Sequence, residues 1–323
     1  MSNETIATLT SVGKEKAIPK KSFRDRVRKH LWLYLLAAPG IIFFFLFSYL
    51  PMAGIIIAFQ DFTSAKGVFD GHFIGLKNFN YFFGSGDFFR ITGNTLYLNI
   101  LFIAFNTITQ VGLAILLNEI RCKLFKRISQ SFAFLPYFVS WIVVSMMAQS
   151  LFSSSTGLIP AWQRSIHQQP INWYNRADLW PFILIFFNSW KWVGSGAVIY
   201  LASISSINMD LYEAARVDGA NRWQQIRHIT LPMLAPTISV LTLLAVGRIF
   251  VGDFGMIYGM VGDNGSLLPT TDVIDTFVYR SLRLLNDVGM ASAVGLYQSV
   301  MGFVMVMVAN HMIRKVHPDG ALF

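Results

Sequence analysis

The sequence predicts an all-α membrane protein that crosses the bilayer six times. Only 13% of its 323 residues are charged, 54% are hydrophobic, and the mean hydropathy is +0.50. Soluble domains contain about 25% charged residues, so roughly half that fraction indicates a chain that lies largely in lipid. The chain has one cysteine, Cys122, which excludes an internal disulfide and a cysteine-rich metal site.

Six apolar segments are long enough to span a bilayer, because about 20 mostly apolar residues cross its hydrocarbon core. The first follows the basic stretch "KKSFRDRVRKH" and is too long for the apolar region of a signal peptide, so we expect a retained anchor. The transmembrane domain is predicted over 31–313, between tails 1–30 and 314–323. Its predicted spans are 31–59, 92–117, 128–152, 181–205, 236–258 and 290–313.

The distribution of Lys and Arg predicts the orientation of these spans. If the N-terminus is cytoplasmic, seventeen of the 26 Lys and Arg residues lie in inner segments. Seven lie in the outer loops, which are 60–91, 153–180 and 259–289. The positive-inside rule therefore predicts that both termini are cytoplasmic. The same distribution of Lys and Arg accounts for the net charge of +9, so no nucleic-acid partner is needed to explain that charge. The polar N-terminal tail is expected to be partly disordered.

One polar segment, 206–235, interrupts the apolar pattern between the fourth and fifth predicted spans. Its central part, "EAARVDGANRWQQIRHITLP", carries two acids, three arginines and a histidine. The predicted orientation places this segment in the cytoplasm. A short polar unit there, with apolar residues along one side and basic residues beside them, is suited to fit a groove on another protein.

A helix–turn–helix is predicted for this segment. Asn208 or Asp210 can cap the first helix, since short polar side chains accept hydrogen bonds from free backbone amides at helix starts. Gly219 is expected to break the helix, because glycine adopts a left-handed conformation without steric cost. Pro232 and Pro236 are expected to end the second helix and to open the fifth span.

The same segment resembles the EAA signature of ABC importer permeases. The matching positions, at the signature's fixed spacing, are Glu213, Ala214, Ala215, Gly219, Ile229, Leu231 and Pro232. Two further stretches, "LLAAPGIIFFFLFSYLPMAGIIIAFQDF" and "GMASAVGLYQ", are similar to permeases that import carbohydrates. Among these, the chain is most similar to permeases for oligosaccharides, including alginate and other uronate oligomers.

The resemblance implies a type I ABC importer permease in the bacterial cytoplasmic membrane, with the EAA segment as a cytoplasmic coupling helix. It implies two copies of a cytoplasmic ATPase, a second homologous permease and an extracytoplasmic solute-binding protein as partners. ATP binding would close the ATPase pair and turn the path outward. The chain has no Gly-x-x-x-x-Gly-Lys-Ser/Thr stretch, so ATP and magnesium are expected on the ATPase. No cofactor and no enzymatic activity are expected in the chain itself.

Two cations lie inside predicted spans, where charged residues are candidates for function. Lys191 and Arg248 are both roughly 16–18 Å deep at 1.5 Å per helical residue, near the depth of transporter substrate sites. Trp190 and Trp192 flank Lys191, and an aromatic plane beside a cation suits a sugar acid. The alternative is a structural ion pair, for example between Arg248 and Asp253.

Polar side chains in the second span form a further candidate. Asn99, Asn106 and Gln110 share one helix face by their spacing. They can line a wet path or bind neighbouring helices, and both interpretations stay open. Asn188 and Tyr297 are weaker candidates for the path. The small residues of "VGSGAVIY" at 193–200 are expected to let helices pack closely.

The favoured function is ATP-driven import of an oligosaccharide, with acidic uronate oligomers preferred over neutral ones. Carboxylates on the substrate would offset the cost of two cations at the bilayer centre. A secondary transporter or channel would be expected to carry buried acids or inverted repeats, and neither is apparent. A membrane-embedded enzyme would need a polar catalytic cluster at the membrane face, and none is visible in the sequence.

Overall fold

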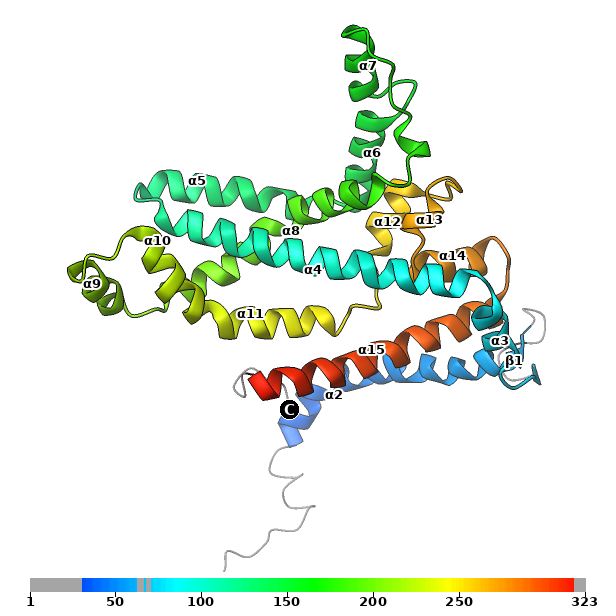
Figure 1. Cartoon of the computed structure of the whole chain (residues 1–323). Helices are drawn as coiled ribbons and strands as arrows, with labels where there is room; N and C mark the ends of the chain where they lie inside the picture. The colour runs from blue at the N-terminus through cyan, green and yellow to red at the C-terminus, as the bar shows by residue number, and fades with distance from the viewer. Residues whose placement is uncertain (1–30, 63–66, 68–70, 317–323) are drawn as a thin grey trace, which may run out of the picture. The chain divides into compact units, whose positions relative to one another are not determined.

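The computed structural model describes residues 31–62, 67 and 71–316, which are mostly helical (Figure 1). The predicted N-terminal tail 1–30 and the last part of the C-terminal tail, 317–323, lie outside the described residues. The chain divides at Gly54 into two units. The first unit contains α2 (Leu31–Phe44), η1 (Phe45–Tyr49) and the start of η2 (Leu50–Phe59). Together these three elements form one apolar helix, as predicted for the first span.

The second unit holds the rest of the chain, including a short antiparallel pair of strands. Its elements are β1 (Gln60–Asp61), β2 (His72–Phe73), α3 (Lys77–Gly84), α4 (Asp87–Glu119), α5 (Lys123–Phe134), η3 (Leu135–Phe138), α6 (Trp141–Phe152), α7 (Leu158–Ser165), η4 (Trp173–Asn175), α8 (Trp180–Ser205), α9 (Met209–Val217), α10 (Arg222–Gln225), η5 (Ile226–Thr230), α11 (Leu231–Val246), α12 (Phe254–Val261), α13 (Leu268–Thr271), α14 (Ile274–Arg283) and α15 (Val288–Val316).

Within the described residues, five helices are long and apolar enough to cross a membrane, and a bent pair can supply a sixth crossing. The predicted second, fourth and sixth spans are confirmed as α4, α8 and α15. The predicted third and fifth spans are not continuous helices. Figure 1 shows α4, α5, α8 and α11 running along one another, while α6 turns away from α5.

The third span breaks between η3 and α6, where the two halves meet at 94°. Pro136 lies in η3 and cannot donate a backbone hydrogen bond, which weakens the helix at this point. Val139 and Ser140 are extended, and the Ser140 hydroxyl then caps α6 by accepting a bond from the Val143 amide at 3.4 Å. Backbone carbonyls freed at such a break need new partners in an apolar setting.

The fifth span also breaks, so the prediction of one helix over 236–258 is wrong. Helix α11 ends at Val246, and α12 starts at Phe254. The Asp275 carboxylate accepts a bond from the Gly252 amide at 2.6 Å, and Gln298 donates to the Phe250 carbonyl at 2.7 Å. These distant side chains from α14 and α15 satisfy the irregular backbone, which the local apolar composition gives no reason to expect.

Close helix packing around α8 confirms the expectation for the small residues at 193–200. A Cβ atom on Gly194 would lie 2.0 Å from the carbonyl oxygen of Ala133 in α5. One on Gly196 would lie 2.1 Å from the side chain of Gln110 in α4. Glycine at these two positions therefore lets the backbones of α5 and α4 approach α8.

Candidate functional site

A cavity of about 610 Å³ opens in the second unit, next to the break between α11 and α12. Helices α4 and α8 supply one part of its wall, the C-terminal half of α11 another, and the first residue of α6 a third. Its polar and aromatic lining includes Asn99, Asn106, Thr107, Gln110, Trp141, Asn188, Trp192, Tyr200, Arg248 and Asp253. The cavity thus combines amides, indole rings, one cation and one acid, Asp253.

The predicted polar line of α4 faces this cavity and also holds helices together. The Asn106 side chain donates to the Asn188 amide oxygen in α8 at 2.8 Å, and Gln110 donates to the Trp192 carbonyl at 3.2 Å. Asn99 donates to the Thr95 carbonyl of its own helix at 2.9 Å. The contacts from Asn106 and Gln110 to α8 support the helix-packing interpretation, and the same amides line the cavity wall, so their role in a path stays a prediction.

Arg248 lies on the cavity wall just after the end of α11, with an exposed side chain. In the part of the chain that the structure describes, it forms no ion pair, and its side chain makes no hydrogen bond. The alternative pair between Arg248 and Asp253 is therefore not formed. Asp253 instead caps α12 by accepting a bond from the Met256 amide at 3.2 Å. Arg248 thus lines the cavity with an exposed side chain.

Lys191 lies beside the cavity and not among its lining residues. Its side chain is buried, and its ammonium donates to the carbonyls of Pro136, at 3.4 Å, Tyr137, at 3.0 Å, and Val139. The carbonyls of Tyr137 and Val139 are freed at the break in the third predicted span, whereas that of Pro136 also accepts a bond from the Val139 amide at 3.1 Å. The ammonium of Lys191 is therefore bound by backbone carbonyls. Lys191 and Arg248 were grouped because of their similar predicted depth, but only Arg248 lines the cavity.

The two tryptophans that flank Lys191 lie in different places. Trp192 lines the cavity, whereas Trp190 lies on a separate apolar groove with Phe182 and Phe186. Tyr297 is also away from the cavity lining. Its ring packs in an aromatic cluster that includes Phe82, Phe83, Phe88 and Phe250.

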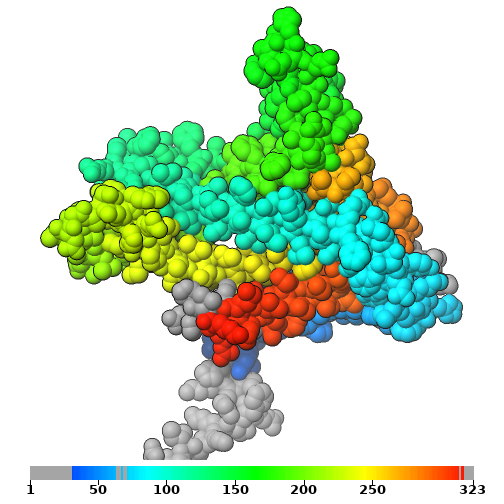
Figure 2. Space-filling model, viewed as in Figure 1, coloured from blue at the N-terminus to red at the C-terminus, as the bar shows by residue number. Residues whose placement is uncertain are grey.

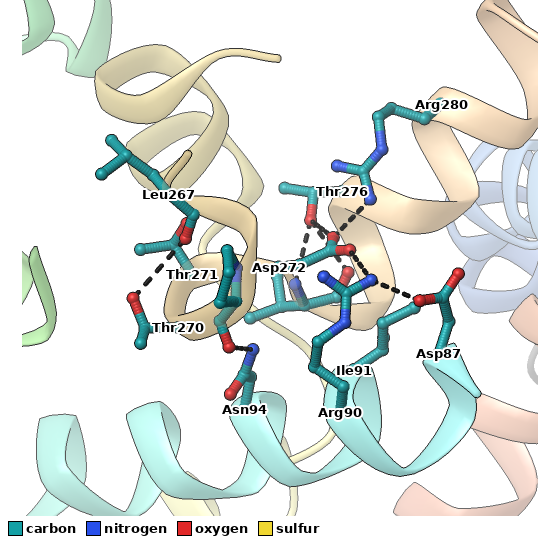
Figure 3. Close-up of polar contacts among 12 residues, drawn as sticks. Asp87, Arg90, Ile91, Asn94, Leu267, Thr270, Thr271, Asp272, Thr276 and Arg280 are labelled. Atoms are coloured by element: carbon teal, nitrogen blue, oxygen red, sulfur yellow. Dashed lines mark hydrogen bonds and ion pairs between the residues drawn. The ribbon is translucent and has the colours of Figure 1, made fainter. Parts of the chain in front are cut away.

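Sequence reasoning missed two features of the second unit. The first is Trp141, which lines the cavity from the start of α6 and carries no sequence signal apart from the preceding cap, Ser140. The second is a buried charge cluster around Asp272, shown in Figure 3. Arg280 donates to Asp272 at 2.5 Å, and Arg90 approaches it at 3.3 Å, so the cluster joins α14 to the start of α4.

The polar segment after α8 forms the predicted helix–turn–helix and lies at one end of the second unit (Figure 2). The Asn208 side chain caps α9 by accepting a bond from the Asp210 amide at 3.0 Å. Gly219 has a φ of 82°, as expected for the break. The Tyr212 and Thr230 hydroxyls lie 2.9 Å apart and join the two arms.

The second arm does not end at the prolines, so this part of the prediction is wrong. The helix runs without interruption from Arg222 to Val246 and contains a π-helical turn, η5, directly before α11. Pro232 lies in the first turn of α11, and Pro236 lies inside it. A π turn beside proline relieves the local hydrogen-bond mismatch, which allows the polar segment and the fifth span to form one helix.

The signature residues are distributed over both arms. Glu213, Ala214 and Ala215 lie on α9, and Gly219 lies in the turn. The other three follow in η5 and α11 as Ile229, Leu231 and Pro232. Exposed apolar side chains accompany them, namely Met209, Val217 and Trp223. The surface of this segment is thus apolar at several points in spite of its charges.

Residues 110–318 match the family described as the inner membrane component of binding-protein-dependent transport systems. The chain belongs to this family. It is 35% identical to Protein LplB of Bacillus subtilis, over 93% of each chain. It is 33% identical to the polygalacturonan/rhamnogalacturonan transport system permease protein YteP of the same species, over 96% of this chain and 99% of that protein.

A solved structure has the same fold. It is the crystal structure of a bacterial alginate ABC transporter in complex with an alginate pentasaccharide-bound periplasmic protein. The match has a TM-score of 0.82 and 33% identity, over 91% of this chain and 98% of the other. The chain is therefore a sugar ABC importer permease of the type I fold, a multi-pass inner-membrane subunit that works with a solute-binding protein. This transporter class implies an ATPase and a second permease.

Proposed function

We propose that this permease imports acidic oligosaccharides, such as uronate oligomers of the alginate type, through the cavity beside Arg248. The observation that carries the proposal is that Arg248, an exposed cation, lines a cavity whose wall also presents amides, indole rings and the single acid Asp253. Arginine can hold a carboxylate through two parallel hydrogen bonds. Amides can bind hydroxyls, and indole faces can contact the apolar faces of sugar rings.

The cost of a cation in the membrane supports an acidic substrate over a neutral one. An arginine near the bilayer centre costs about 2.5–3.5 kcal/mol on insertion scales. A passing carboxylate offsets that cost, whereas a neutral sugar does not. The names of two similar proteins point the same way, because alginate and polygalacturonan are both polymers of sugar acids.

Neutral oligosaccharides are the second candidate, favoured by the amides of the cavity wall. Asn99, Asn106, Gln110 and Asn188 can bind hydroxyl groups whether or not the sugar carries a carboxylate. An acid on the second permease would cancel the charge of Arg248 and favour this candidate. The two candidates differ in the expected role of Arg248, which binds a substrate carboxylate in the first candidate and has no such contact in the second.

We assign energy coupling to the segment 206–235 as the second part of the proposal. Helix α9 and the turn at Gly219 form the surface that docks on a cytoplasmic ATPase. Both chain termini lie on the cytoplasmic side of the membrane, as this surface does. Two ATPase copies bind ATP and magnesium, and a second permease completes the path. The continuous helix Arg222–Val246 supports this role, since it leads from the docking surface to the cavity wall.

The substrate proposal is tested by comparing Arg248→Met with Arg248→Lys in the reconstituted transporter. Uptake is measured with alginate oligosaccharides and with the same oligomers after reduction of their carboxyl groups. We expect Arg248→Met to lose uptake of the charged oligomers selectively, and Arg248→Lys to retain part of it. Equal losses on both substrates would indicate a structural cation, and unchanged uptake on both would exclude the proposed contact.

A further inference from the structure

The break between η3 and α6 is stabilised by one side chain from another helix. Three backbone carbonyls, those of Pro136, Tyr137 and Val139, converge on the ammonium of Lys191. An ammonium has three hydrogens to donate, so this arrangement matches its capacity. Lys191 is only 6% exposed. The carbonyls therefore accept charge-assisted hydrogen bonds from a buried ammonium.

The same ammonium contacts the first residue after the break. Lys191 Nζ lies 5.1 Å from the centre of the Trp141 ring, within the range of a cation–π interaction. A Cβ atom on Gly255 would lie 3.2 Å from Trp141 Cδ1, so α12 also packs directly against the indole. Trp141 therefore contacts both the Lys191 ammonium and the backbone of α12.

Both tryptophans of the cavity wall contact this break. Trp141 starts α6, and the Trp192 ring packs against Tyr137 with ring centres 5.5 Å apart. The Tyr137 carbonyl is one of the three acceptors of Lys191. The position of the η3–α6 break thus affects where both indoles stand on the cavity wall.

We propose that Lys191 is a positioning residue for sugar binding, which fixes the 94° break and thereby presents Trp141 as an aromatic surface for the sugar ring. The proposal rests on the cavity's role as the sugar path. It differs from the assignment of Arg248, because Lys191 touches the wall and not the substrate. Its effect should be independent of the charge on the oligosaccharide.

The test is a double-mutant cycle in the purified transporter complex, with Lys191→Met, Trp141→Leu and the two changes together. Equilibrium binding is measured with radiolabelled alginate trisaccharide and with its carboxyl-reduced form. Cation–π contacts, from exposed to desolvated, correspond to about a 2- to 30-fold change in affinity, so we expect each single variant to weaken binding within that range. The double variant should be no weaker than the weaker single variant, and Lys191→Arg should recover part of the affinity.

A distance measurement distinguishes a change in the position of α6 from a general loss of folded protein. Spin labels at Ser150 in α6 and Ile199 in α8, in a Cys122→Ser background, report the place of α6. Lys191→Met should broaden the distance distribution, whereas Trp141→Leu should leave it unchanged. If Lys191→Met does not assemble, Lys191→Gln, which keeps an amide donor, replaces it in both measurements.

The outcomes separate this inference from the proposed function. Weaker binding of both trisaccharides with Lys191→Met supports positioning, even if Arg248→Met fails to discriminate between them. Losses that multiply in the double variant would overturn the inference, as would unchanged affinity with Lys191→Met. A loss confined to the charged trisaccharide would also overturn it, because it would place Lys191 on the substrate carboxylate.

Discussion

Asp272 and Arg280 form a buried ion pair, with a guanidinium nitrogen 2.5 Å from a carboxylate oxygen. The Asp272 side chain is fully buried and also accepts a bond from the Thr276 hydroxyl at 3.0 Å. Removing one member of such a pair leaves an uncompensated charge, which costs about 3–5 kcal/mol. We therefore expect Asp272→Asn to lower the thermal stability of the solubilised protein strongly.

The matched control is Asp178→Asn, in the segment between η4 and α8. Asp178 pairs with Arg176 at 2.8 Å, but both side chains are more than half exposed. The hydrogen bond from Arg176 holds the pKa of the Asp178 carboxyl below its usual value, so it is ionised at neutral pH. Exposed pairs contribute little, and Asp178→Asn should leave thermal stability nearly unchanged. Equal losses in the two variants would contradict the structural role of the Asp272 cluster.

Two glycines on α8 should differ in their tolerance of a side chain. In Gly194→Ala the new Cβ would meet the backbone of Ala133, which cannot move without shifting α5. In Gly196→Ala it would meet the far end of the flexible Gln110 side chain. Overpacking typically costs about 1–3 kcal/mol, and we expect Gly194→Ala to lie at the upper end. Thermal stability and membrane yield of the two variants, measured together, decide the order.

Sequence patterns predicted the elements whose signals are local. Long apolar runs gave α4, α8 and α15, and short polar signals gave the cap at Asn208 and the turn at Gly219. Each depends on residues within one or two helical turns, where composition and capping act directly.

The breaks in two spans could not be predicted, because their partners are distant in the sequence. Lys191 satisfies carbonyls 52 to 55 residues away, and Asp275 binds an amide 23 residues away. Depth alone grouped Lys191 with Arg248, although tertiary packing gives Lys191 backbone partners and leaves the side chain of Arg248 exposed on the cavity wall. The break also explains the missed role of Trp141, whose place on the cavity wall depends on the direction of α6.

The orientation of the chain remains a prediction that a fusion reporter can test. A reporter that is active only outside the cytoplasm should be active when fused near Gly265 and inactive near Lys126. The physical reason is the excess of Lys and Arg in the segments predicted to be inside. The reverse pattern would move the segment 206–235 out of the cytoplasm and would remove the basis for its coupling role.

Gly219 provides the test of energy coupling. Its φ of 82° is strained for residues with side chains, most of all for β-branched ones. A Cβ atom there would meet no atom of the described residues within 4 Å, so a substitution acts through the turn itself or through a bound partner. We expect Gly219→Val to reach the membrane and to separate ATP hydrolysis from uptake, with uptake reduced at least about tenfold.

Gly219→Asn is the matched variant, because asparagine tolerates the left-handed conformation better than other residues with side chains. It should retain much more uptake than Gly219→Val if the conformation of the turn is what matters. Membrane level, ATPase activity and uptake are measured for both variants in the same vesicles. Equal defects would place the effect at the docking surface instead of the turn, and normal uptake by Gly219→Val would show that this segment does not couple ATP hydrolysis to transport.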